Sequence, residues 1–167
     1  MSTNLTLEQR ITRLEDYEAI KVLIANFSRG ADAKCDPRIL RPLFCDDAVF
    51  DIGQFGVLEG GEHIVNEMHN NTDIGFNWTL HYLVSPVIEI HDDLVSATCF
   101  YYLWETATHR TRQDVEDSYW IGGWYDANVV KESDGCWRFK HLKLTIKLLS
   151  SYSEGWKEIP ASFDDLG

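Results

Sequence analysis

Two side chains of this sequence, Asp32 and His81, could together carry out proton-transfer chemistry. Asp32 ends the run FSRGAD, and His81 lies within the aromatic-rich run NWTLHYLVSP. A histidine is a good general base near neutral pH, and a carboxylate bonded to its other ring nitrogen fixes the tautomer and the orientation of the ring. Such a pair needs no adjacency in sequence, only a shared cavity. We therefore predict an Asp32–His81 pair that takes a proton from a bound substrate.

Each of the two residues also has an ordinary structural explanation. An aspartate at a helix end commonly helps the chain to turn, here toward Pro37. A histidine inside an apolar strand is commonly a hydrogen-bonded core residue. The catalytic interpretation therefore depends on a fold that brings Asp32 and His81 together.

The elements that must position the pair begin with helices. Apolar residues recur at helical spacing over residues 7–30, which predicts one amphipathic helix, continuous or broken near Asp16, with Thr6 or Asn4 as its N-cap. The run PRILRPLF predicts a short second helix, because proline suits a first helical turn. The run GGEHIVNEMHN predicts a third helix, and the alternating run DAVFDI before it predicts a strand.

The second half of the chain has the composition of long β-strands. Such runs cover residues 78–90, 94–106, 115–131 and 136–149. Asp92-Asp93 and residues 133–135 predict tight turns, residues 107–114 a polar loop, and Gly122-Gly123 a bulge. We predict an α+β fold: a cone-shaped, curled antiparallel sheet wrapped around the long N-terminal helix and two shorter helices. Residues 1–167 would form one domain, with a core at 7–149 and a tail at 150–167.

The composition excludes several classes of partner and cofactor. The chain has 27 acidic against 15 basic residues, a net charge of −12, which disfavours nucleic acid as a partner. No apolar run approaches the roughly 20 residues that span a bilayer, and the first residues lack the apolar segment of a secretory signal, so we expect no membrane association and a cytoplasmic location. His63, Glu67 and His69 share one predicted helix without a metal-site spacing, and the chain has no phosphate-binding loop. We expect neither metal nor cofactor.

Four segments together resemble the SnoaL-like branch of the nuclear transport factor 2-like superfamily. Within that branch the resemblance is to the group of scytalone dehydratase, bile-acid 7α-dehydratase and hexachlorocyclohexane dehydrochlorinase. It covers roughly residues 7–149 and rests on the order and spacing of the segments more than on any one motif. The segments are YEAIKVLIANFSRGADAK, LFCDDAVFDI, WTLHYLVSP and IGGWYDANVVKESDGCWRF.

The resemblance implies roles for three residues. The family's catalytic acid and histidine fall on Asp32 and His81, and a further acid of the bile-acid dehydratase falls on Glu105. Glu105 could otherwise be an exposed residue at a strand end. Relatives often carry a polar residue five positions before the catalytic acid, whereas this chain has Phe27, so another group would have to assist the leaving group. Glu105, Tyr101 or Tyr102 could be that donor.

The expected activity is therefore a cofactor-independent lyase of the dehydratase or elimination type. Aromatic residues make up 13% of the chain, enough to line a pocket for a small hydrophobic, aromatic or alicyclic substrate. The candidate lining residues are Phe27, Phe50, Tyr101 and Trp120. The alternatives are an isomerase of the ketosteroid-isomerase type, a carbon–carbon lyase, and a non-catalytic ligand-binding or assembly module.

We also expect the chain to assemble into a homodimer or homotrimer. A curled sheet usually leaves one broad apolar face that its own helices do not cover, and large exposed apolar patches are rare on monomers. The large rings that suggest such a face are Trp120, Trp124, Trp137 and Phe139.

Overall fold

The N-terminal helix is a single continuous element in the computed structural model, which describes residues 5–72, 75–110 and 116–157. α1 (Leu7–Asp32) passes through Asp16 without a break. Thr6 is the N-cap: its hydroxyl accepts from the Gln9 backbone N–H (3.2 Å), and the Gln9 side chain accepts from the Thr6 backbone N–H (2.9 Å). This reciprocal capping box fixes where the helix begins.

Short elements follow and lead into the sheet. α2 (Pro37–Leu40) is capped by Asp36 and continues into a 3₁₀ turn at Arg41–Leu43. β1 (Phe44–Asp51) and β2 (Val57–Glu59) form a hairpin-like pair, and α3 (Gly61–Asn70) comes next. Within the described part of the chain, no helix combines the length and the apolar character needed to cross a membrane.

Four long strands make most of the sheet. They are β3 (Phe76–Ile90), β4 (Ser96–Arg110), β5 (Glu116–Lys131) and β6 (Trp137–Ser151). The sheet order is β2-β1-β6-β5-β4-β3. The long strands pair antiparallel as predicted, but β1 runs parallel to β6, so the sheet is mixed. β4 extends through residues 107–110 of the predicted polar loop, and the rest of that loop, 111–114, lies outside the described residues.

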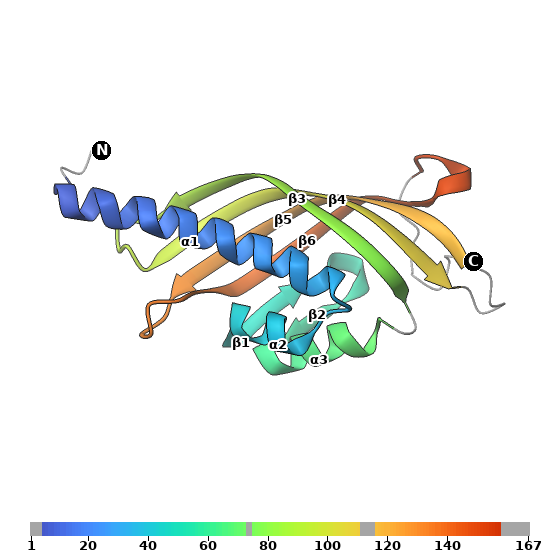
Figure 1. Cartoon of the computed structure of the whole chain (residues 1–167), viewed down its shortest axis with the longest axis horizontal. Helices are drawn as coiled ribbons and strands as arrows, with labels where there is room; N and C mark the ends of the chain where they lie inside the picture. The colour runs from blue at the N-terminus through green and yellow to red at the C-terminus, as the bar shows by residue number, and fades with distance from the viewer. Residues whose placement is uncertain (1–4, 73–74, 111–115, 158–167) are drawn as a thin grey trace.

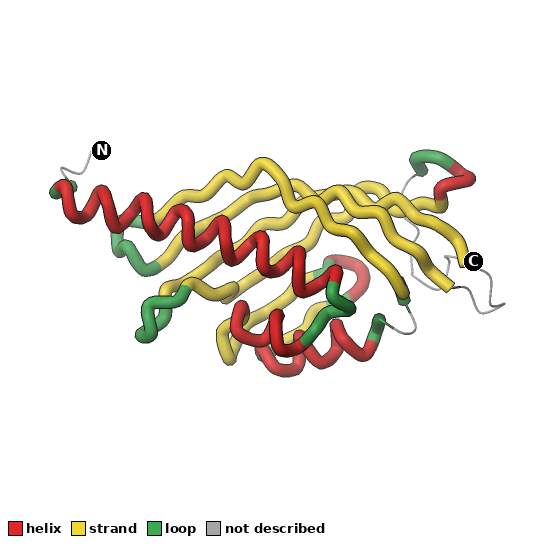
Figure 2. The backbone as a smooth tube through the Cα atoms, in the orientation of Figure 1, coloured by secondary structure: helices red, strands yellow, loops and turns green. Residues whose placement is uncertain are grey.

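The sheet is curled but not closed, and α1 lies along its concave face with α2 and α3 beside the C-terminal half of the helix (Figures 1 and 2). The predicted bulge at Gly122-Gly123 is present, because the register between β5 and β6 shifts there. A Cβ atom on Gly123 would lie 2.0 Å from the carbonyl oxygen of Thr145. Only glycine therefore permits this close approach of the two strands.

Successive side chains along each strand point to opposite faces, so the sheet has a buried concave face and a partly exposed convex face. The concave face carries buried residues that include Tyr101, Leu103 and Ile121, which belong to one core cluster with the buried face of α1. The convex face carries rings that remain between 37% and 51% exposed, namely Trp78, Tyr82, Tyr102 and Trp104. The predicted assembly face is corrected in part, because Trp137 and Phe139 are buried in the core and only Trp120 and Trp124 lie on the convex side.

Candidate active site

Asp32 and His81 are in direct contact. Asp32 is the last residue of α1, and its Oδ1 atom lies 2.7 Å from Nδ1 of His81 on β3. The same oxygen accepts the backbone N–H of His81 at 3.0 Å. An ionised carboxylate can only accept hydrogen bonds, so the proton of this contact sits on Nδ1. Nε2, the other ring nitrogen, is thereby left to face the interior of the sheet.

Two side chains of α1 fix the helix against β3 at this point. Ser28 and Asp32 lie one turn apart and so share a helix face. The Ser28 hydroxyl donates to the carbonyl oxygen of His81 (2.8 Å), while Asp32 accepts from the backbone N–H of the same residue. The helix end therefore holds both the backbone and the ring of His81.

Glu105 lies directly opposite His81 in the pairing of β3 with β4, and both side chains point to the concave face. Oε2 of Glu105 is 3.3 Å from Nε2 of His81. Glu105 is only 5% exposed, so the alternative of a solvated strand-end residue is wrong. The imidazole thus stands between two carboxylates, one at each ring nitrogen.

Burial and the neighbouring charges shift the pKa values of His81 and Glu105. Burial alone would lower the pKa of His81, but the Glu105 carboxylate and the hydrogen bond to Asp32 outweigh it, so the pKa of the imidazole is raised above its ordinary value. Burial, followed by repulsion from Asp32, raises the pKa of Glu105 despite the nearby imidazole. Both shifts have the same direction: His81 and Glu105 each hold a proton more firmly in the folded protein than they would in water.

The predicted lining residues divide between the two faces. Phe27, Phe50 and Tyr101 are buried in the concave core, where the Phe27 ring meets Phe50 edge-on at a centroid distance of 6.4 Å. The prediction that Trp120 lines the site is wrong, because Trp120 pairs with Thr106 on the convex face, opposite to the side that carries His81. It therefore cannot line a cavity around His81 within one chain.

The candidate donors Tyr101 and Tyr102 divide in the same way. Tyr102 is half-exposed on the convex face and is not near Glu105. Tyr101 is fully buried, and its hydroxyl has no hydrogen-bond partner among the described residues. Its ring stacks on Tyr125 at a centroid distance of 5.2 Å.

Sequence reasoning missed Ser28 and Tyr125. Ser28 could have been found as the residue one turn before Asp32 on the same helix face. Tyr125 is buried on the concave face, and burial, with the charges of Glu105 and Cys35, raises the pKa of its hydroxyl, which keeps it a donor. Its membership of this face could not be read from the sequence, because it depends on the register around the Gly122-Gly123 bulge.

Two surface cavities, of about 300 and 90 Å³, lie elsewhere on the molecule. Neither contains Asp32, His81 or Glu105, so neither is the closed apolar cavity expected around the pair. In residues 5–72, 75–110 and 116–157, no three His, Cys, Asp or Glu side chains are arranged to hold a metal ion. Nδ1 of His69, one of the residues considered for such a site, instead faces the Lys34 carbonyl oxygen at 2.9 Å.

Comparison with known proteins identifies the family. The model of the SnoaL-like domain matches residues 12–143, and the chain belongs to this family. Among curated proteins, none matches the sequence significantly.

Solved structures share the fold. A scytalone dehydratase-like protein of Novosphingobium aromaticivorans DSM 12444 has a TM-score of 0.74 at 20% identity, over 86% of this chain and 91% of its own. The hexachlorocyclohexane dehydrochlorinase LinA Type2 has a TM-score of 0.77 at 20% identity, over 90% and 97%. LinA-type3 of Novosphingobium barchaimii LL02 has a TM-score of 0.75 at 18% identity, over 90% and 99%. At these identities the likeness establishes the nuclear transport factor 2-like fold and no more.

Proposed function

We propose that this protein is a cofactor-independent lyase that eliminates a β-substituent from a small hydrophobic substrate, with His81 as the general base. One observation carries the proposal. The imidazole is held at Nδ1 by Asp32 (2.7 Å) and faces a second, buried acid, Glu105, at Nε2 (3.3 Å). A base with a fixed tautomer beside a separate proton donor is what an elimination requires.

The protonation states of His81 and Glu105 return to their starting values after one turnover. In the reactive form His81 is protonated at Nδ1 only, and the carboxyl group of the buried Glu105 is protonated. Nε2 takes a proton from the substrate carbon, the electrons of that C–H bond form the new double bond, and the leaving group departs with the proton of Glu105. The products are the alkene and the protonated leaving group. The imidazolium then returns its Nε2 proton to the Glu105 carboxylate across their contact, which restores the starting state.

Asp32 acts in this scheme through the imidazole. Its carboxylate keeps the Nδ1 proton in place and stabilises the imidazolium that forms when Nε2 accepts a proton. It does not touch the reacting atoms, so its role is positioning and electrostatic stabilisation. The bond it accepts from the His81 backbone N–H (3.0 Å) ties this position to the strand itself.

The substrate class follows from the surroundings of the cluster. The concave interior beside Glu105 consists mainly of rings and aliphatic side chains, including Phe27 and Tyr125, whose centroids lie 5.7 Å apart. A substrate that reaches the cluster would meet apolar side chains and a few polar groups, which suits an aromatic or alicyclic compound. The elimination enzymes among the similar structures, a dehydrochlorinase and a scytalone dehydratase-like protein, add support by analogy of fold.

A ligand screen followed by product analysis tests the proposal. Aromatic and alicyclic alcohols and halides that raise the melting temperature would be incubated with the protein in deuterated water, with His81→Ala as the matched control. We expect products lighter than the substrate by water or by a hydrogen halide, formed only by the native sequence. Products that keep the atoms of the substrate, with or without one hydrogen exchanged for deuterium, would instead define an isomerase. Two carbon fragments would define a carbon–carbon lyase, and binding without turnover a non-catalytic module.

A further inference from the structure

A second concave site lies at the opposite end of α1 from Asp32. It is a cavity of about 300 Å³ between the first half of α1 and the end of β3, lined by Arg10, Arg13, Leu14, Tyr17, Ile88 and Ile90. Because a helix rises about 1.5 Å per residue, roughly 22 Å of continuous α1 separates Tyr17 from Asp32. We call this cavity the arginine groove; it is separate from the His81 site.

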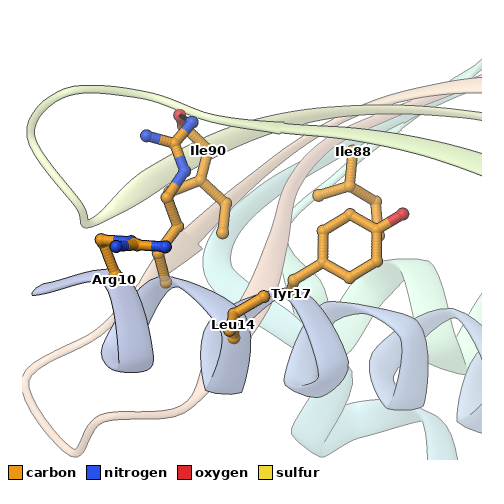
Figure 3. Close-up of a pocket in the computed structure, with 6 residues that line it drawn as sticks. Arg10, Leu14, Tyr17, Ile88 and Ile90 are labelled. Atoms are coloured by element: carbon orange, nitrogen blue, oxygen red, sulfur yellow. Dashed lines mark hydrogen bonds between the residues drawn. The ribbon is translucent and has the colours of Figure 1, made fainter. Parts of the chain in front are cut away.

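The arginine groove is polar at one end and apolar at the other. Its helical residues recur at three- and four-residue spacing and so share one face of α1. Figure 3 shows Arg10 at one end, Leu14 in the middle, and the Tyr17 ring facing Ile88 at the other end. A ligand lying along the groove would therefore meet guanidinium groups first and then a ring and aliphatic side chains.

The two guanidinium groups are available to an anion. Arg13 donates one bond from Nη2 to the carbonyl oxygen of Ile90 (2.8 Å), and no described carboxylate pairs with Arg10 or Arg13. Asp16, one helical turn after Arg13, is engaged elsewhere, because its carboxylate binds Lys131 and the Trp137 indole N–H (3.0 Å).

These features define the kind of ligand. A guanidinium presents a planar set of N–H donors that matches a carboxylate, often through two parallel bonds. The volume is near the lower end of small-molecule sites, about 300–1,000 Å³, which suits one ring or a short branched chain. We propose that the arginine groove binds a small organic carboxylate, whose anionic end pairs with Arg10 and Arg13 while its apolar body packs on Leu14, Tyr17 and Ile88.

Titration of the full chain with benzoate tests the proposal, with benzyl alcohol as its neutral counterpart. We expect saturable benzoate binding, followed by NMR, that shifts the backbone amides of residues 10–17 and 88–90. Benzyl alcohol should bind about tenfold or more weakly, because it lacks the charge-assisted hydrogen bonds. Equal binding of the two compounds, or amide shifts confined to residues around His81, would overturn the proposal.

Three variants test which side chains of the arginine groove contribute to benzoate binding. Arg10→Gln/Arg13→Gln should weaken benzoate binding about tenfold or more, whereas Arg29→Gln, which removes one positive charge from an exposed position farther along α1, should leave it unchanged. Leu14→Glu should also abolish binding, because the new carboxylate would occupy the guanidinium groups; Leu14 is 68% exposed, so the substitution leaves the core intact. Undiminished binding in both the arginine and the Leu14 variants would refute the assignment. The assignment would also be refuted if the native chain does not bind benzoate and the arginine variant has a lower mass in light scattering. That result would assign the groove to a contact between copies of the chain.

Discussion

Nε2 of His81 and Oε2 of Glu105 lie 3.3 Å apart, at the ring nitrogen that Asp32 does not occupy. The pKa values of both buried groups are raised, so each holds a proton more firmly than it would in water. A single proton on either atom of this contact gives the cluster with Asp32 the same net charge. This relationship makes Glu105 the residue whose replacement should most clearly change the behaviour of the protein with pH.

Folding stability should fall as pH rises through the titration of this pair. Both folded pKa values lie above the ordinary values of 4.5 and 6.5, so the folded state binds more protons than the unfolded state from about pH 4.5 upward. The stabilisation is fully present below the ordinary values and is lost as pH passes the raised ones. Glu105→Gln should flatten this dependence, as measured by urea unfolding at several pH values. Glu18→Gln, an exposed change on α1, is the control, and identical profiles for native protein and Glu105→Gln would contradict the prediction.

Loss of His81 should reduce turnover more than loss of charge at Asp32. His81→Ala removes the proposed base, which typically costs about 10²–10⁴-fold in rate. Asp32→Asn leaves a base that is less well oriented, and its amide oxygen can still accept the His81 backbone N–H. Both variants should keep a near-native melting temperature. A His81→Ala protein that is destabilised yet turns over its substrate would show that His81 is a core residue and not the base.

Asp16 should matter for stability and not for catalysis. Its buried carboxylate binds Lys131 Nζ (2.6 Å) and the Trp137 indole N–H (3.0 Å), which joins α1 to β5 and β6. Asp16→Ala should lower the free energy of unfolding by about 3 kcal/mol, because it leaves the amine and the indole N–H without their acceptor. Adding Lys131→Met should recover part of the loss in urea unfolding. A change below about 0.5 kcal/mol, the scale of ordinary surface substitutions, would disprove this anchoring role.

We propose that the convex face mediates self-association into a homodimer or homotrimer. Tyr82 and Tyr102 are each about half exposed there and lie on neighbouring strands. Tyr82→Glu/Tyr102→Glu should shift the assembly toward the 19.3 kDa monomer in light scattering, because burial of the new charges is unfavourable. Val22→Glu, on the exposed side of α1, should not. A native protein that is already monomeric at micromolar concentration would exclude the proposal.

Much of the fold could be predicted because the hydrophobic period separates a mostly helical first part, with one alternating run at β1, from a second part of long strands. Helical spacing ends near Asn70 and long β-rich runs follow, which fixes the order of elements and the side-chain alternation that separates the two faces. The contact between Asp32 and His81 was also within reach of prediction, because the family resemblance places its catalytic acid and histidine on these two residues. The chemistry of an aspartate–histidine pair favours the same pairing.

The remaining features depend on pairings that the sequence does not specify. The parallel association of β1 with β6 is a choice between sheet edges that no local pattern encodes. The face of Trp120 depends on register, since a shift of one residue would move every side chain of a strand to the other side. The burial of Glu105 is likewise a product of its pairing with His81, because a glutamate in a polar strand end has the same local sequence as one in a site.

The two bonds that α1 makes to the backbone of His81 also cover part of an open edge of the sheet. β3 is the last strand of the sheet, and an edge strand offers unpaired N–H and C=O groups to any strand that approaches. At His81 those two groups are already taken, by Asp32 and Ser28 of the same chain. Asp32, which contacts the imidazole, and Ser28 thus also close this point of the sheet edge to pairing with another strand.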